Sequence, residues 1–302
     1  MRVFITGATG YIGGSIAVRL IAAGHRVTGL ARTTGKADAL AGLGVEPVVG
    51  TLDDVETLTA AARAADAVIN AASSDHRAAA DTLIDALAGT GKVLIHTSGS
   101  SIVGDDSRGE ASDRVYTEAD VLDGWQPEPD KAARVALDRA VLAAADRGVR
   151  SAVLCNTLIY GHGRGLSRDS VQIPRLVDQA RESGVVRHVG PGHNIWSNAH
   201  VDDVADAYLK ALDTVAAGSF LFVENGEASF LDVTTAIADA LELGPPEAWD
   251  IDSAIAEWGY EPAVFALGSN SRVRGTARDA LGWRPRHASV TEWIRDGLNA
   301  SE

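Results

Sequence analysis

Four hydroxyl side chains follow one apolar run in the first half of the chain. The stretch LIHTSGSSIVG, residues 94–104, carries Thr97, Ser98, Ser100 and Ser101 within five positions. A hydroxyl at the end of a strand can donate a hydrogen bond to an oxygen on which negative charge develops, and this polarises a carbonyl group. These hydroxyls are therefore candidates for chemistry at the end of a strand.

A glycine-rich turn near the N-terminus indicates a dinucleotide cofactor. VFITGATGYIGG, residues 3–14, places Gly7, Gly10 and Gly13 between an apolar strand and an apolar helix. The first glycine permits a tight turn, the second lets the backbone approach a pyrophosphate, and the third lets the helix pack on the strand. The helix N-terminus adds N–H donors and a positive dipole. The predicted cofactor contacts in this turn are Gly7, Thr9, Gly10, Tyr11, Ile12 and Gly13.

The residues after the second apolar run favour NADP(H) over NAD(H). An acidic residue about 20 positions after the glycine turn usually binds the free ribose 2′-hydroxyl of NAD. Here RVTGLA, residues 26–31, is followed by Arg32, and Lys36 comes soon after. A guanidinium suits phosphate oxygens. We therefore expect Arg32 and Lys36 to bind a 2′-phosphate.

These segments need a scaffold, and the apolar pattern predicts a doubly wound α/β fold with a parallel sheet. Strands with little polar alternation, spaced by helices, are typical of sheets covered on both faces. The candidate strands lie in 1–7, 25–31, 45–50, 65–72, 92–98, 151–157 and 219–225. Glycine and proline interrupt the chain more often beyond residue 165. We expect a cofactor domain over 1–165 with a return segment at about 198–225, and a smaller substrate lobe over 166–197 and 226–302.

Composition limits the possible partners. The formal charge of −14 is spread along the chain, which argues against nucleic acid and against an anionic membrane. Cys155 is the only cysteine, so an intrachain disulfide is excluded and a reducing compartment is favoured. No run of about 18 apolar residues and no leader segment occur. We expect a cytoplasmic protein that binds a small molecule, with a homodimer possible through its alanine-rich helices.

Several motifs, taken in order, resemble the extended short-chain dehydrogenase/reductase family, the NAD(P)-dependent epimerase/dehydratase group. They are TGATGYIGG, NAA after the fourth strand, HTSGSSIVG after the fifth, LIYG after the sixth, and HVDDVADAY. The similarity spans nearly the whole chain. It implies further cofactor contacts at Thr51, Leu52, Ala71, Ala72, Thr97, Asn156 and Leu158. It also implies that residues 94–104 form the nicotinamide-side wall of the active site, where a serine or threonine binds the reacting oxygen. Gly99 falls at the usual position of that residue, so its neighbours Ser98 and Ser100 are the candidate donors. On the next helix the resemblance implies a Tyr-x-x-x-Lys pair.

That pair is missing from this chain. None of the five tyrosines is followed by a lysine four residues later. Alignment of the expected helix places Asp130 where the family has tyrosine and Arg134 where it has lysine. Arg134 could bind ribose hydroxyls, but a guanidinium does not release its proton. Asp130 is better explained as a solvated acid at a helix N-terminus.

Other groups in the sequence are candidate proton donors or ligands. Tyr160 is the predicted third catalytic residue, although a structural role for it is also open, and His200 is expected to pack near the site. Tyr116 is expected in a surface loop. Asp202 and its neighbour Asp203 are typical of helix capping, so no metal site is predicted. Trp196 occupies a position where relatives that act on nucleotide sugars place arginine, which favours a smaller and less charged substrate.

Together these observations predict an NADP(H)-dependent oxidoreductase that reduces a small carbonyl or related C=X group with non-standard acid chemistry. Two alternatives stay open. One is a non-catalytic NADP(H) sensor, like the regulators of nitrogen metabolite repression that keep this fold without the pair. The other is a redox-neutral epimerase, dehydratase or lyase.

Overall fold

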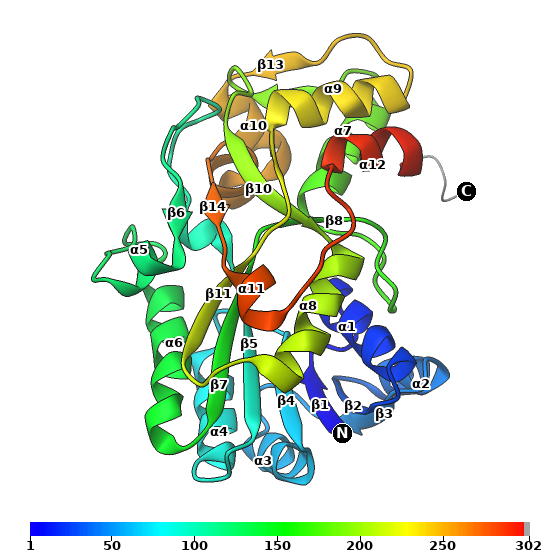
Figure 1. Ribbon diagram of the computed structural model, residues 1–302. Coiled ribbons are helices and arrows are strands. Elements are labelled where there is room, and N and C mark those ends of the chain that lie inside the picture. The colour runs from blue at the N-terminus through cyan, green and yellow to red at the C-terminus, as the bar shows by residue number, and fades with distance from the viewer. Residues whose placement is uncertain (299–302) are drawn as a thin grey trace.

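A seven-stranded parallel sheet forms the centre of the larger domain. The computed structural model describes residues 1–298, and the sheet has the order β3-β2-β1-β4-β5-β7-β11 (Figure 1). Its strands are β1 (Arg2–Thr6), β2 (Arg26–Ala31), β3 (Glu46–Val49), β4 (Ala67–Asn70), β5 (Val93–Gly99), β7 (Arg150–Asn156) and β11 (Ser219–Val223). Each coincides with one of the predicted runs, and only β5 and β7 extend beyond their run, by one residue each. The doubly wound α/β prediction is confirmed.

Helices cover both faces of this sheet, as the continuous apolar strands require. One face packs against α1 (Tyr11–Ala22), α2 (Thr34–Gly42), α8 (Val201–Thr214) and α11 (Ala277–Leu281). The other face packs against α3 (Val55–Ala64), α4 (Arg77–Leu87) and α6 (Ala132–Ala143). Two separate hydrophobic cores result, one on each side of the sheet. All four residues of β4 are buried between them.

A smaller lobe lies over the carboxyl ends of the strands (Figure 1). It contains the sheet β12-β10-β8, formed by β8 (Leu158–Tyr160), β10 (Ile195–His200) and β12 (Glu227–Ser229), and the pair β9 (Arg187–Val189) with β13 (Glu247–Trp249). Its helices are α7 (Gln172–Ser183), α9 (Phe230–Ala240), α10 (Ile251–Trp258) and α12 (Val290–Gly297), with a π-helix at Pro262–Leu267. These elements enclose a third hydrophobic core.

Short elements connect the two parts. The strand β6 (Tyr116–Thr117) leads into α5 (Glu118–Leu122) and pairs with β14 (Val273–Arg274). The chain then returns to the larger domain through α11 and Trp283, whose indole N–H donates to the carbonyl of Asp203. This return comes from residues beyond 226, which the sequence places in the smaller lobe. Each part is therefore built from segments that are not consecutive in the sequence.

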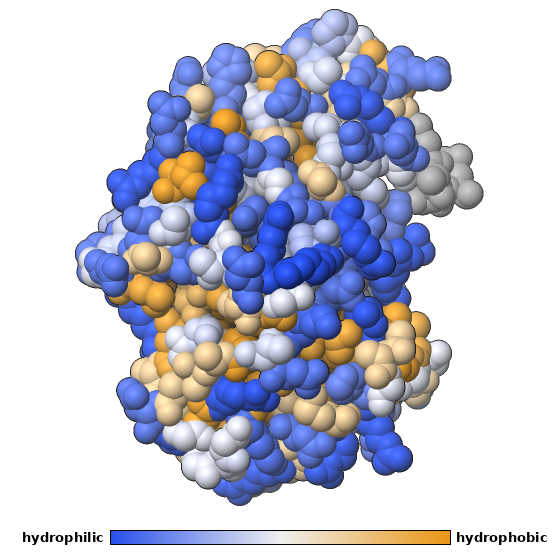
Figure 2. Space-filling view, in the orientation of Figure 1, coloured by the Kyte–Doolittle hydropathy of each residue, from blue (hydrophilic) through white to orange (hydrophobic). Residues whose placement is uncertain are grey.

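The surface is mixed in character. In the view of Figure 2, hydrophilic residues dominate the small lobe and a band across the middle, and apolar residues are more frequent over the sheet domain below. Among the described helices, none has the length and apolar character that crossing a membrane requires.

Candidate active site

The glycine turn is held in the form that a diphosphate requires. Gly7 has φ of +79°, and a Cβ there would lie 2.5 Å from the carbonyl oxygen of Ala71. A Cβ on Gly13 would lie 2.4 Å from the carbonyl oxygen of Gly7. Gly10 is the N-cap of α1 and offers no side chain to the helix, so the first amides of α1 have neither a capping side chain nor an intrahelical acceptor. An anion fits there.

The end of β2 presents two cations to solvent. Arg32 and Lys36 are both exposed, and Thr33 uses its hydroxyl to cap α2. Within residues 1–298, the Arg32 side chain makes no hydrogen bond or ion pair. Thr51 and Leu52 follow the neighbouring β3, where Leu52 packs against the core. This edge can therefore accept a phosphate without losing an existing contact.

A cavity of about 480 Å³ opens where the end of β5 meets α6, α7 and the π-helix. Its polar lining consists of Ser100, Ser101, Lys131, Arg134, Asn156, Thr157, Gln172, Arg175 and Glu261. Its apolar lining consists of Gly99, Val171, Trp196, Pro262, Phe265 and Ala266. No tyrosine is among these lining residues, and this volume suits a small molecule.

The four hydroxyls of residues 94–104 have different surroundings. Because side chains alternate along a strand, Thr97 and Ser98 face opposite sides of the sheet. Tyr208 donates to Thr97 across 2.9 Å, whereas Ser98 donates to Asp138 across 2.7 Å. Ser100 accepts from Ser271 at 2.8 Å. Of the two predicted serines, Ser100 lines the cavity and Ser98 does not.

Ser101 is the hydroxyl of this stretch that accepts a hydrogen bond from a cationic side chain. Arg134 donates to its Oγ across 3.0 Å, and the same guanidinium forms two hydrogen bonds of 2.7 and 2.6 Å to Asp75. The pairing lowers the pKa of the Asp75 carboxyl, because Arg134 stabilises its charged form. Ser101 thus accepts from a fixed cation and keeps its own proton to donate.

A buried polar chain lies behind the cavity. Asn70 donates to Nδ1 of His96 across 3.0 Å, and Nε2 of His96 lies 3.6 Å from Asp138. The Asp138 side chain is buried on α6, and burial raises its pKa to about 7. Burial lowers the pKa of His96 to about 4. Ser98 completes this chain, so its hydroxyl is committed to Asp138.

Asn156 lines the cavity and carries an unused acceptor. Its amide nitrogen donates to the hydroxyl of Tyr208 across 3.0 Å, whereas its buried Oδ1 has no partner among the described residues. A nicotinamide carboxamide carries N–H donors that match this oxygen. The neighbouring Leu158, also predicted at the nicotinamide, packs into the core of the small lobe. Asn156 and the glycine turn together fit a nicotinamide dinucleotide.

Two predicted aromatic residues have structural partners. Tyr160 is completely buried and donates to the carbonyl of His287 across 3.1 Å. Tyr11 donates to the carbonyl of Gly161 across 2.7 Å, which ties the loop after β8 to α1. Burial raises the pKa of both phenols above their ordinary value. Neither hydroxyl lines the cavity.

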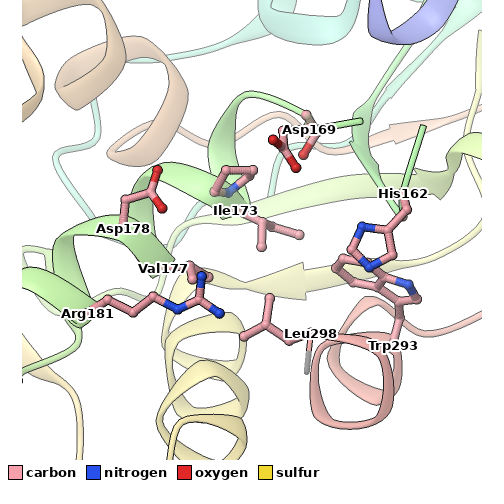
Figure 3. A pocket seen from close by; sticks show the side chains of 11 residues that line it. His162, Asp169, Ile173, Val177, Asp178, Arg181, Trp293 and Leu298 are labelled. Carbon is pink, nitrogen blue, oxygen red and sulfur yellow. The ribbon is translucent and has the colours of Figure 1, made fainter. Parts of the chain in front are cut away.

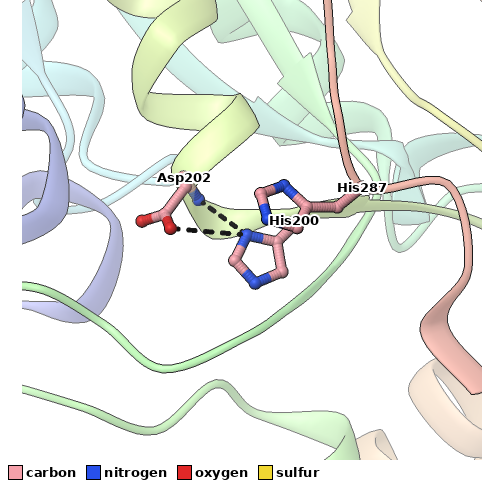
Figure 4. Close-up of side chains that lie close together, drawn as sticks. All are labelled: His200, Asp202 and His287. Atoms are coloured by element: carbon pink, nitrogen blue, oxygen red, sulfur yellow. Dashed lines mark hydrogen bonds and ion pairs between the residues drawn. The ribbon is translucent and has the colours of Figure 1, made fainter. Parts of the chain in front are cut away.

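His200 belongs to a cluster that resembles a metal site in composition. His200, Asp202 and His287 lie close together (Figure 4), and the two imidazole rings stack at 3.8 Å. Several of the polar atoms already have partners, however. The Asp202 carboxylate receives two hydrogen bonds from Arg164, and Nδ1 of His200 accepts from the Asp202 amide. We assign this cluster a structural role at the start of α8.

A second cavity of about 260 Å³ lies between α7 and α12 (Figure 3). His162 and Trp293 line one side, and Asp178 and Arg181 of α7 line another. Its wall includes Leu298, the last described residue. None of the predicted site residues lines this cavity, and it offers no hydroxyl wall like that of β5.

Several site residues escaped the sequence reasoning. Asp75 is one of them, because its partner Arg134, itself a predicted site residue, is 59 positions away and the pairing has no local sequence signal. Arg175 and Gln172 share one face of α7, but without the fold that face has no known neighbour. Asp138 had a usable signal, because it is an acid at a buried position of an amphipathic helix, between Val135 and Val141.

The chain is similar to several known proteins. A model of the NAD dependent epimerase/dehydratase family matches residues 3–220. Oxidase ucsJ of Acremonium sp is 34% identical over 324 residues, covering 94% of this chain and 92% of that protein. The 2-alkyl-3-oxoalkanoate reductase of Stenotrophomonas maltophilia is 29% identical over 249 residues, covering 75% and 71%. The dTDP-glucose 4,6-dehydratase of Bacillus anthracis, solved in complex with NAD, shares the fold with a TM-score of 0.77 at 16% identity, covering 99% of this chain and 95% of that chain.

Proposed function

Because the chain belongs to the NAD dependent epimerase/dehydratase family, we propose that it is an NADP(H)-dependent reductase of a small carbonyl or related C=X compound. One observation carries the proposal: Ser101 lines the cavity at the carboxyl end of β5 and accepts a hydrogen bond from Arg134. The names of the two relatives, an oxidase and a 3-oxoalkanoate reductase, support redox chemistry.

The cofactor would lie along the carboxyl edge of the sheet. The glycine turn and the first amides of α1 would hold the diphosphate, Arg32 and Lys36 the 2′-phosphate, and Asn156 the carboxamide. The resemblance adds further proposed contacts at Thr51, Leu52, Ala71, Ala72, Thr97 and Leu158. When bound in its reduced form, the cofactor supplies the hydride for the carbonyl carbon.

The chain itself must stabilise the substrate oxygen and give it a proton. Ser101 can donate its hydroxyl proton to that oxygen, while Arg134 stabilises the negative charge that then develops on the serine. Arg134 retains its own protons at neutral pH, so water would reprotonate Ser101. Ser100 lies next to it and accepts from Ser271, so it is the second hydroxyl available to the substrate.

A non-catalytic NADP(H) sensor is the second candidate. The observation that favours it is that no tyrosine lines the described cavity. Such a protein would bind the cofactor and change its contacts with a partner, but it would not consume NADPH.

A screen of NADPH consumption against aldehydes, ketones and imines tests the proposal. We expect at least one class to give steady oxidation of NADPH with formation of the corresponding alcohol or amine. Failure of every class, together with tight cofactor binding, would replace the reductase by the sensor. Product formed without net NADPH consumption would indicate a redox-neutral enzyme.

Replacing Arg32 by alanine tests the cofactor preference. We expect the Kd for NADPH to rise roughly 10- to 100-fold, since one or two charge-assisted hydrogen bonds to the 2′-phosphate are lost. The Kd for NADH should stay unchanged, because NADH lacks that phosphate. Calorimetric titration measures both, and Arg26→Ala, at the other end of β2, is the matched control. Equal affinity of the wild type for both cofactors would contradict the NADP assignment.

A further inference from the structure

The wall of the cavity is basic although the chain as a whole is acidic. The protein has 27 basic and 41 acidic residues. The cavity nevertheless collects Lys131, Arg134 and Arg175, and Glu261 is the only acid among its lining residues. A wall of this composition raises the local concentration of anions.

The three cations differ in what they already bind. Arg134 is paired with Asp75, and Lys131 lies 2.6 Å from Asp130 with its ammonium 3.7 Å from the Phe265 ring centre. Arg175 has no acidic partner within residues 1–298. Its guanidinium makes one hydrogen bond, from Nη1 to the Val171 carbonyl at 2.9 Å, one turn earlier in the chain.

Arg175 therefore keeps most of its donors for a ligand. It is partly buried and lines the cavity beside Gln172, whose amide nitrogen is used by the Ala266 carbonyl. A guanidinium presents N–H donors in a planar fork that matches the two oxygens of a carboxylate. Because no described acid pairs with it, the partly buried Arg175 can form an ion pair with an anionic group of a ligand.

The other residues that line the cavity indicate the chemistry of the rest of the ligand. Trp196 and Phe265 supply aromatic surface, and the Trp196 indole N–H is already donated to the Ser269 carbonyl. Because that donor is occupied, Trp196 offers its ring face rather than a polar group. An alkyl or aryl segment suits this surface.

We propose that the substrate of this site is a carboxylate-bearing carbonyl compound, with its carboxylate bound by Arg175 of α7 and its carbonyl oxygen directed to Ser101. The proposal rests on the proposed function for the position of the carbonyl, but not for the carboxylate. A carboxylate is favoured over a phosphate dianion because Arg175 is a single unpaired cation and Glu261 shares its wall. The size of the cavity, about 480 Å³, fits such a compound.

Binding of non-reducible acids tests the carboxylate site without turnover. The probes are 4-phenylbutanoate and octanoate, each compared with its primary amide by calorimetry on the full chain with saturating NADP⁺ and again without cofactor. We expect an acid to bind wild type at least 10-fold more tightly than its amide, and Arg175→Gln to abolish that difference. Arg181→Gln, on the same helix but at the other cavity, is the control and should behave as wild type.

Turnover gives an independent readout. For 4-oxo-4-phenylbutanoate and its methyl ester, Arg175→Gln should lower kcat/KM for the acid by roughly 10- to 100-fold and leave the ester unchanged. Equal binding of acids and amides by wild type, or acid binding that survives Arg175→Gln, would overturn the proposal. Arg175-dependent acid binding without any reduction would keep the carboxylate site and remove the reductase function instead.

Discussion

Replacing Ser101 by alanine is expected to lower kcat by about 10²–10³, with the Kd for NADPH unchanged. Alanine removes the one cavity hydroxyl that accepts from Arg134, so the substrate oxygen loses a donor that is already oriented. Steady-state kinetics at saturating NADPH measure the effect, with a substrate from the consumption screen. Ser101→Thr retains the hydroxyl and should recover part of the rate.

Ser98→Ala is the matched control for that experiment. Ser98 lies three positions earlier, but its hydroxyl donates to Asp138 behind the cavity. We expect its removal to change the free energy of unfolding and to leave kcat within a few-fold of wild type. A wild-type rate in Ser101→Ala, or an equal loss in Ser98→Ala, would show that the proton chemistry has been assigned to the wrong serine.

Asp138→Asn is expected to change how stability depends on pH. Burial raises the folded-state pKa of Asp138 from 3.8 to about 7, so the folded protein holds a proton that the unfolded chain has released above pH 4. The free energy of unfolding of the wild type therefore falls as pH rises from about 4 to 7. A pKa shift of this size corresponds to about 4 kcal/mol of unfolding free energy. Asparagine does not titrate, so the variant gains that amount relative to wild type over the same range.

Urea unfolding of both proteins between pH 5 and 8 measures roughly 60% of this change, the part that falls above pH 5. In the folded protein the neighbours of Asp138 do not titrate strongly in that range, because burial lowers the pKa of His96 to about 4 and raises that of the Cys155 thiol. Titration of His96 in the unfolded chain is common to both proteins and leaves their difference unchanged. Arg134, one turn earlier on α6, stays charged. A difference in unfolding free energy that stays constant with pH would mean that Asp138 is ionised in the folded protein throughout.

The fold was largely predictable because its signals are local. Each strand of the large sheet is a short apolar run, and burial on both faces leaves such runs without polar alternation. The glycine turn was equally clear, since Gly7 and Gly13 sit where any Cβ would collide with backbone. The return of α11 and Trp283 to the larger domain was not predicted, because their packing against α8 is a contact between distant segments.

The site was predictable only in part. Of the predicted hydroxyl stretch, only residues 99–101 line the cavity, because the side that each hydroxyl faces depends on the register and on the turn after β5. The sequence favours Ser98 and Ser100 because they flank Gly99 at the family's usual serine or threonine position. Nothing in the sequence shows that Arg134 reaches Ser101. Arg175 had no signal either, because only the structure shows that no described acidic residue pairs with it.

Transfer of deuterium from labelled NADPH is the most direct test of reductase activity. The wild type would be incubated with a responsive carbonyl compound and NADPH deuterated at C4 of the nicotinamide, in turn on each face, and the product analysed by mass spectrometry. Reduction predicts one deuterium at the carbinol carbon from one of the two labelled cofactors, with one NADP⁺ formed per product. Product without deuterium from either cofactor, or bound cofactor that is never oxidised, would contradict the assignment of this chain as a reductase.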